Sequence, residues 1–149
     1  MQSIPNIFII ASEYHSNITH RLHSGAQNTW YHTTQSDVPA QTIWVPGAVE
    51  IPLTTAWVAE EHRPDAMVCL GCVIRGETPH FEYVCEQVSH GIQRVSLETQ
   101  IPIIFGVLTV NHLNQALQRI GGTAGHKGSE AMEAALKMIA IKRNIQGEL

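Results

Sequence analysis

Charged residues are scarce in this sequence, and the basic ones are scattered. Charged side chains make up 15% of the 149 residues, whereas soluble domains average about 25%, so we expect some surface to be buried between subunits. Thirteen acidic residues outnumber nine basic ones and give a net charge of −4. Because a phosphate backbone attracts clustered Lys and Arg, nucleic acid is not expected as a partner.

The sequence also lacks a long apolar run. No stretch reaches the ~20 apolar residues that a membrane-spanning helix needs. The first residues show neither the basic region nor the cleavage-like site of a secretion signal. We therefore expect a cytoplasmic protein without a membrane segment. A chain of 149 residues fits one domain and is long enough to fold without disulfides or metals.

Cysteine is rare as well. Three residues are an odd number, which does not indicate a secreted disulfide framework. Cys69 and Cys72 form a C-x-x-C pair, but both lie in an apolar segment, residues 66–74, that is typical of a buried strand. Residues three apart on a strand lie on opposite faces, so we expect ordinary buried thiols and no redox centre.

The sequence instead alternates strand-like and helix-like segments. Apolar runs predict strands at residues 7–11, 66–74 and 103–108, and a further strand is predicted at 41–45, stopped by Pro46 and Gly47. Helices are predicted at 17–30, 51–61, 111–120, 127–144 and from His80 onward, with a loop at 31–40 and a turn at 121–125. This alternation indicates an α/β fold, in which helices cover both faces of a parallel sheet. Such sheets bind ligands beyond the carboxyl ends of their strands.

Details of three helices are also predicted. Asn17 is expected to cap the first helix. The apolar stripe of the helix that begins at His80 is expected to consist of Phe81, Val84, Val88, Ile92 and Val95. The inner side of the last helix is expected to consist of Ala131, Ala134, Ala135, Met138 and Ile141.

The segment after the third predicted strand combines an anion site with a proton carrier. Arg75, Gly76 and Thr78 suit an anion, because free N–H groups converge at a strand-to-helix junction. His80 opens the next helix, and a histidine transfers protons readily near neutral pH. The segment therefore predicts a phosphate-and-proton site.

Two other strand ends allow both a functional and a structural interpretation. The N–H groups of Ala48 and Val49 could meet a ligand carbonyl, and the Glu50 carboxylate could accept hydrogen bonds from sugar hydroxyls. A plain helix start is favoured when this segment is taken alone. Tyr14 could stack on a planar heterocycle or pack on the first helix, and the sequence favours neither interpretation.

Arg119 and Lys127 flank a glycine-rich turn. Two cations and free N–H groups suit an anion, although the Walker pattern is absent. A simple helix–helix turn is the alternative.

The other histidines are expected to be solvated. His20 and His23 lie three residues apart, which would permit metal binding, but no third ligand is near in sequence. We expect the same of His62, His90 and His112.

Four motifs, taken together, resemble one known family. They are PGAVEIP, GCVIRGETPHFEYV, IPIIFGVLT and RIGGTAGHKGSEA, in this order and at these separations. They resemble the lumazine synthase family, which carries out the penultimate step of riboflavin biosynthesis, and the resemblance covers residues 7–138. It implies a flavodoxin-like α/β three-layer sandwich with a four-stranded parallel sheet and helices on both faces, as one domain.

The resemblance also implies an activity. Members condense 5-amino-6-(D-ribitylamino)uracil with 3,4-dihydroxy-2-butanone 4-phosphate to give 6,7-dimethyl-8-ribityllumazine, phosphate and water. No metal and no organic cofactor is implied. The implied assembly is a homo-oligomer based on pentamers, with the active site between subunits, and riboflavin synthase is a further candidate partner. The short segment before the first strand favours a pentamer or decamer over a larger shell.

The resemblance assigns roles residue by residue. His80 is the implied proton carrier. The implied contacts to the pyrimidine and its ribityl chain are Tyr14, Ala48, Val49, Glu50, Val73, Ile74, Phe105 and Lys127. The implied phosphate contacts are Gly76, Glu77, Thr78 and Arg119. Phe105, Arg119 and Lys127 would come from the neighbouring subunit, and Glu130 matches an acidic position near that lysine.

The chain departs from the family pattern at Glu13, His15, Pro79 and His126. Three other functions compete with the enzyme. A non-catalytic flavin or lumazine carrier would not need His80 or Arg119. A sugar-phosphate aldolase or isomerase would use Lys127 as a Schiff base. A pure assembly protein would carry a vestigial site.

Overall fold

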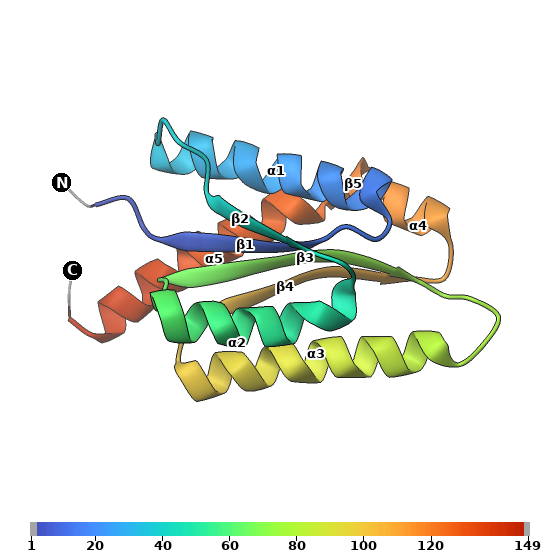
Figure 1. Ribbon diagram of the computed structural model, residues 1–149. Helices are drawn as coiled ribbons and strands as arrows, with labels where there is room; N and C mark the ends of the chain where they lie inside the picture. The colour runs from blue at the N-terminus through green and yellow to red at the C-terminus, as the bar shows by residue number, and fades with distance from the viewer. Residues whose placement is uncertain (1–2, 148–149) are drawn as a thin grey trace.

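The computed structural model describes residues 3–147 and contains a four-stranded parallel sheet in the order β2-β1-β3-β4. Its strands are β1 (Ile7–Ser12), β2 (Gln41–Val45), β3 (Ala66–Ile74) and β4 (Ile103–Val110). Helices α1 (Ser16–Thr34) and α5 (Lys127–Ile145) cover one face, and α2 (Ile51–His62) and α3 (His80–Thr99) cover the other (Figure 1). The expected α/β three-layer sandwich is confirmed.

The shorter elements gather at the end of the sheet where the strands finish (Figure 1). They are the 3-10 helix η1 (Ala48–Glu50), helix α4 (Leu113–Leu117) and the hairpin of β5 (Ile120–Gly122) and β6 (Gly125–His126). The loop from β3 to α3 projects from the same end (Figure 1). None of the described helices is long and apolar enough to cross a bilayer.

Alternate residues of each strand supply two separate cores. On β1, Ile7 and Ile9 face α1 and α5, whereas Phe8 and Ile10 face α2 and α3. A strand covered on both faces has few polar positions, and the whole of β1 is buried.

The C-x-x-C pair lies on β3, as predicted. Cys72 belongs to the core on the α1–α5 side and Cys69 to the core on the α2–α3 side, so the two thiols point away from each other. Burial raises the pKa of Cys72 to about 11 and that of Cys69 further still. Both thiols are therefore protonated at neutral pH and unsuited to redox chemistry.

Helix α1 differs from its prediction at both ends. It begins at Ser16, after His15 in a left-handed conformation (φ 61°), whose carbonyl accepts hydrogen bonds from two N–H groups of the first turn. Asn17 therefore lies inside the helix, and the prediction that it caps α1 was wrong. The helix continues to Thr34 and ends at Gln35, which is left-handed (φ 58°) and whose N–H donates to the Tyr31 carbonyl at 3.0 Å. The Trp30 indole N–H also donates to the Val38 carbonyl, at 3.0 Å, which holds the following loop against the helix.

The helix predicted at 111–120 is reduced to α4 and followed by the β5–β6 hairpin. Gly121 and Gly125 have φ of 105° and 79°, which a side chain would disfavour. The chain therefore turns back on itself at once, and Ile120 pairs with His126.

The inner face of α5 is rotated relative to the prediction. Met138 and Ile141 are each 41% exposed, and the buried face consists of Gly128, Ala131, Met132, Ala135 and Ile139. Gly128 sets this rotation, because it lies directly against the Leu22 carbonyl of α1.

Gly128→Ala is expected to destabilise the protein although alanine ordinarily stabilises a helix by about 1 kcal/mol over glycine. A β-carbon there would lie 2.0 Å from the Leu22 carbonyl oxygen, so α1 and α5 must separate. We expect a loss of about 1–3 kcal/mol in the free energy of unfolding by urea denaturation. Gly76→Ala, whose new methyl group would meet no atom within 4 Å, is the control. Equal stability of the two variants would contradict the close α1–α5 contact.

Candidate active site

The carboxyl ends of β1, β2 and β3 enclose a cavity of about 470 Å³. Nine of the predicted site residues line it: Tyr14, Ala48, Val49, Glu50, Val73, Ile74, Gly76, Thr78 and His80. Glu77, which lies between Gly76 and Thr78 in the sequence, is exposed and does not line the cavity. We call this cavity the His80 half-site. His15, Gly47, Phe81 and Val84 also line the cavity. They were not predicted as site residues, because glycine after a proline is typical of a turn and Phe81 and Val84 belong to an apolar helix stripe.

A second cavity, of about 370 Å³, lies between β4 and α5. Phe105, Arg119, Lys127 and Glu130 line it, and we call it the Arg119 half-site. Of the described residues, none lines both cavities. The structure thus brings the predicted residues together in two groups, and these are the two groups that the resemblance assigned to neighbouring subunits.

Tyr14 is held by its backbone and leaves its ring open to solvent. Its N–H donates to the Pro46 carbonyl at 3.1 Å, which ties the end of β1 to the end of β2. Tyr14 is 69% exposed, so the alternative in which it packs on α1 is excluded. The His15 ring meets it edge-on, with 4.5 Å between the ring centres. Burial lowers the pKa of His15, so a neutral imidazole supports the exposed tyrosine ring.

The η1 turn follows Pro46 and Gly47, which end β2. The N–H of Glu50 donates to the Gly47 carbonyl at 3.2 Å, and the Glu50 carboxylate remains exposed. Ala48 is buried and Val49 is 41% exposed. The first N–H groups of such a turn have no partner within it. The structural interpretation of a helix start is therefore correct, and the same residues also face the cavity.

His80 is the first residue of α3 and is exposed. The loop before it is open: within residues 3–147, the N–H groups of Gly76, Glu77 and Thr78 meet no protein acceptor in hydrogen-bonding geometry. Free N–H groups beside a helix N-terminus favour an anion. Arg75, which also suited an anion, instead directs its guanidinium toward Glu82 and Asn111.

The Arg119 half-site owes its geometry to the β5–β6 hairpin. The Lys127 N–H donates to the Arg119 carbonyl at 2.8 Å, so the hairpin brings the two cationic residues side by side. The Lys127 ammonium lies 3.4 Å from the Glu130 carboxylate, and the Arg119 guanidinium donates to the Gln115 carbonyl at 2.7 Å. The ring of Phe105, on the free edge of β4, is 42% exposed. The glycine-rich segment is thus more than a helix–helix turn.

Comparison with known proteins agrees with this arrangement. The family model of 6,7-dimethyl-8-ribityllumazine synthase matches residues 5–143. A 6,7-dimethyl-8-ribityllumazine synthase of Coxiella burnetii is 46% identical over 141 residues, which are 93% of this chain and 91% of the relative. The chain belongs to the lumazine synthase family. The resemblance of its four motifs is confirmed over nearly the whole chain.

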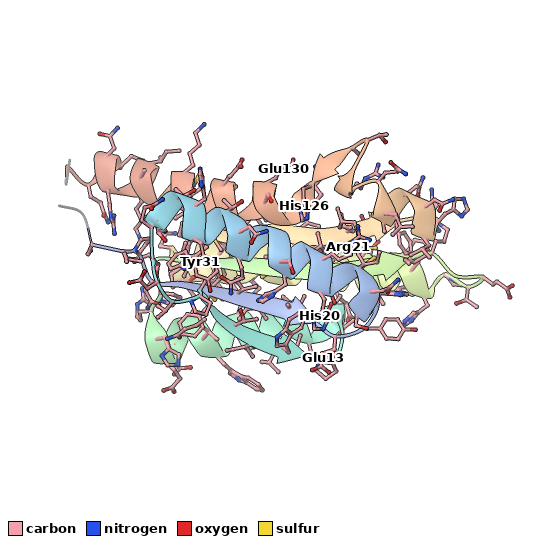
Figure 2. All side chains as sticks on the ribbon, turned by 90° about the horizontal axis from the view of Figure 1, so that it is seen from above. Glu13, His20, Arg21, Tyr31, His126 and Glu130 are labelled. Carbon is pink, nitrogen blue, oxygen red and sulfur yellow. The ribbon has the colours of Figure 1, made fainter. Side chains whose placement is uncertain are left out.

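One departure from the lumazine synthase pattern, His126, has a structural role. Its Nδ1 accepts a hydrogen bond from the Ser129 N–H at 3.3 Å and so caps α5. The ring lies between the start of α5 and α1 (Figure 2), against Gly25, where any β-carbon would collide with it. His126 therefore supports the helix that carries Lys127 and Glu130.

The remaining histidines are mostly exposed. His23 is an exception to the prediction: it is half-buried and its Nε2 lies 2.9 Å from the Thr42 hydroxyl. Burial, and then the neighbouring His20, lower its pKa. His20 itself stacks on Trp44 at 4.4 Å between ring centres. Among residues 3–147, no three His, Cys, Asp or Glu side chains converge in a way that suits a metal ion.

His126→Ala is expected to lower the free energy of unfolding by about 1 kcal/mol through loss of the α5 cap. His126→Asn keeps a capping oxygen and is expected to recover most of this loss. His90→Ala, an exposed histidine on α3, is the control. The measurement is urea denaturation followed by circular dichroism. A His126→Ala protein as stable as the wild type would show that the cap contributes nothing.

Proposed function

We propose that this chain condenses 5-amino-6-(D-ribitylamino)uracil with 3,4-dihydroxy-2-butanone 4-phosphate to 6,7-dimethyl-8-ribityllumazine, with release of phosphate and water. Membership of the lumazine synthase family supports the reaction. The observation that carries the proposal is the division of the required residues between two open half-sites, with His80 in one and Arg119 in the other.

We further propose a cytoplasmic homopentamer in which the Arg119 half-site of one subunit completes the His80 half-site of the next. Exposed apolar side chains support this pairing: Tyr14 is 69% and Phe105 is 42% exposed. Rings that face water in one chain would be buried between two chains, which is favourable. The low charged fraction of 15% agrees with buried subunit contacts.

The pyrimidine substrate would lie in the His80 half-site. The Tyr14 ring would stack on the pyrimidine, and the Glu50 carboxylate would accept hydrogen bonds from the ribityl hydroxyls. Val73 and Ile74 would pack against the ring. Lys127, from the neighbouring subunit, would contact the polar edge of the pyrimidine.

The phosphate of the second substrate would be held by the free N–H groups of residues 76–78. The Arg119 guanidinium of the neighbour would neutralise its charge. The amine of the pyrimidine then attacks the ketone, water leaves to give an imine, phosphate leaves by elimination, and the ring closes with loss of water. Each step moves a proton, and His80 would carry it.

His80→Ala is expected to lower kcat by ~10²–10⁴-fold without abolishing turnover, because holding the two substrates together still accelerates the reaction. The two substrates are mixed with wild-type and variant protein, and the lumazine product is followed by its absorbance. His90→Ala, on the exposed side of α3, is the control and is expected to behave as wild type.

Two outcomes of this assay would count against the proposal. Wild-type protein that binds the lumazine but forms none from the substrates would be a carrier instead of an enzyme. An unchanged single-turnover rate for His80→Ala would remove this residue from the mechanism.

Arg119→Ala is expected to raise the KM for the butanone phosphate far more than the KM for the pyrimidine, because only the first substrate carries the phosphate. Steady-state kinetics with each substrate varied in turn separates the two constants. Equal effects on both would contradict the role assigned to Arg119.

A further inference from the structure

The Arg75 side chain connects three segments around the open loop of the His80 half-site. Its Nε donates to the Asn111 side-chain oxygen at 2.8 Å, just after β4. One Nη donates to the carboxylate of Glu82, in the first turn of α3. The guanidinium also covers the ring of Phe81, with 4.4 Å from its carbon to the ring centre. We call these three contacts the Arg75 clamp.

The clamp holds the residues on both sides of His80's loop. Arg75 precedes the loop, and its own N–H donates to the Val110 carbonyl at 2.9 Å, so its backbone is fixed to β4. Phe81 and Glu82 directly follow His80. The Arg75 guanidinium therefore connects the residue before the loop to the first turn of α3 after it.

The other contacts of the loop are few. A β-carbon on Gly76 would meet nothing within 4 Å, and within residues 3–147 the N–H groups of residues 76–78 have no protein partner. Such a loop samples many conformations unless its ends are held. The clamp and the bond from the Arg75 N–H to the Val110 carbonyl are thus contacts that restrict the ends of the loop.

The clamp continues toward the Arg119 half-site. The Asn111 N–H donates to the Gln115 side-chain oxygen at 2.7 Å, and the Gln115 carbonyl accepts from the Arg119 guanidinium, also at 2.7 Å. The side chain that holds the His80 loop is thus tied to the turn that carries Arg119.

We infer that Arg75 is a positioning residue, which orients the 76–78 loop and His80 through Glu82 and Asn111 without touching the phosphate. The inference rests on the proposed function, since it concerns the same site. This role requires Glu82 to be ionised at neutral pH. The hydrogen bond from Arg75 is the main cause that lowers the pKa of Glu82, and a hydrogen bond from its own backbone is the second. A lowered carboxyl pKa keeps the link intact at neutral pH and weakens it only as the pH falls through that pKa.

The alternative is that Arg75 binds the phosphate directly. The two roles predict opposite effects of Glu82→Gln. If Arg75 bound the phosphate, loss of the competing carboxylate would free its charge and lower the KM for the butanone phosphate. If Arg75 positions the loop, the same change loosens the loop and raises that KM, although the site has become less negative.

The test compares Arg75→Ala, Arg75→Lys and Glu82→Gln with wild type in the lumazine assay. We expect each to lower kcat/KM for the butanone phosphate, up to about a hundredfold for Arg75→Ala, which is the effect of displacing reacting groups by ~1 Å. The KM for the pyrimidine is expected to change little. Arg75→Lys keeps the charge but cannot reach Asn111 and Glu82 together, so it is expected to rescue only part of the loss.

The chain offers a matched control on the same helix. Arg94 and Glu98 form an exposed ion pair on α3, with 2.8 Å between Nε and the carboxylate, away from both half-sites. Arg94→Ala and Glu98→Gln are expected to leave both KM values and kcat at wild-type levels. Thermal unfolding of all variants is compared as well, and the exposed location of both pairs predicts little change.

Amide hydrogen exchange provides a readout that does not depend on turnover. We expect the N–H groups of residues 82 and 83, which donate to the Pro79 carbonyl, to exchange faster in Arg75→Ala and Glu82→Gln than in wild type or the control variants. Unchanged exchange, or a lower butanone-phosphate KM in Glu82→Gln, would overturn the inference. Wild-type protein that makes no lumazine would refute the proposed function instead, and the exchange measurement alone would then decide whether Arg75 holds the loop.

Discussion

The strand order β2-β1-β3-β4 is the constraint on which the rest of this molecule depends. Because β3 is central, the loop that follows it opens beside the ends of β1 and β2, and His80 comes to lie near Tyr14 and Glu50. Because β4 is at the edge, Phe105 and the cavity that it lines with Arg119 and Lys127 lie at the side of the sheet away from β1 and β2. One chain thus keeps the two half-sites apart, and this separation is the physical basis for proposing a site between subunits.

The two half-sites are supported in different ways. Close packing holds the Arg119 half-site: Gly128 lies against Leu22, the His126 ring lies against Gly25, and the Ser129 hydroxyl donates to the Gly25 carbonyl at 3.2 Å. Exposed polar contacts hold the loop of the His80 half-site, chiefly those of Arg75. A packed support resists displacement, whereas a loop with few contacts can adapt to a ligand. The Arg119 half-site is therefore the more rigid of the two, and the loop of the His80 half-site the more adjustable.

Much of the fold could be predicted because its signals are local. The strands at 41–45 and 66–74 have the predicted bounds. Pro46 ends the first, and the second is an apolar run ended by Arg75–Gly76. The opposite orientations of Cys69 and Cys72 follow from the two-residue repeat of a strand. One of the two errors was local, and the other came from a contact with a distant segment. Asn17 lost the capping position to a left-handed His15, and the α5 face was rotated by the contact of Gly128 with α1.

Some features of the candidate site could likewise be predicted from the sequence, and others could not. The sequence by itself determined the family, the residue types of the site and the strand ends at which they lie, because motifs and hydrophobic periodicity are properties of neighbouring residues. Only the tertiary structure decided that Arg75 is committed to Glu82 and Asn111, that His126 supports α5, and that Arg119 and Lys127 lie apart from His80 on one chain. The reason is physical: a hydrogen bond or a van der Waals contact between distant segments exists only after the sheet has fixed their separation.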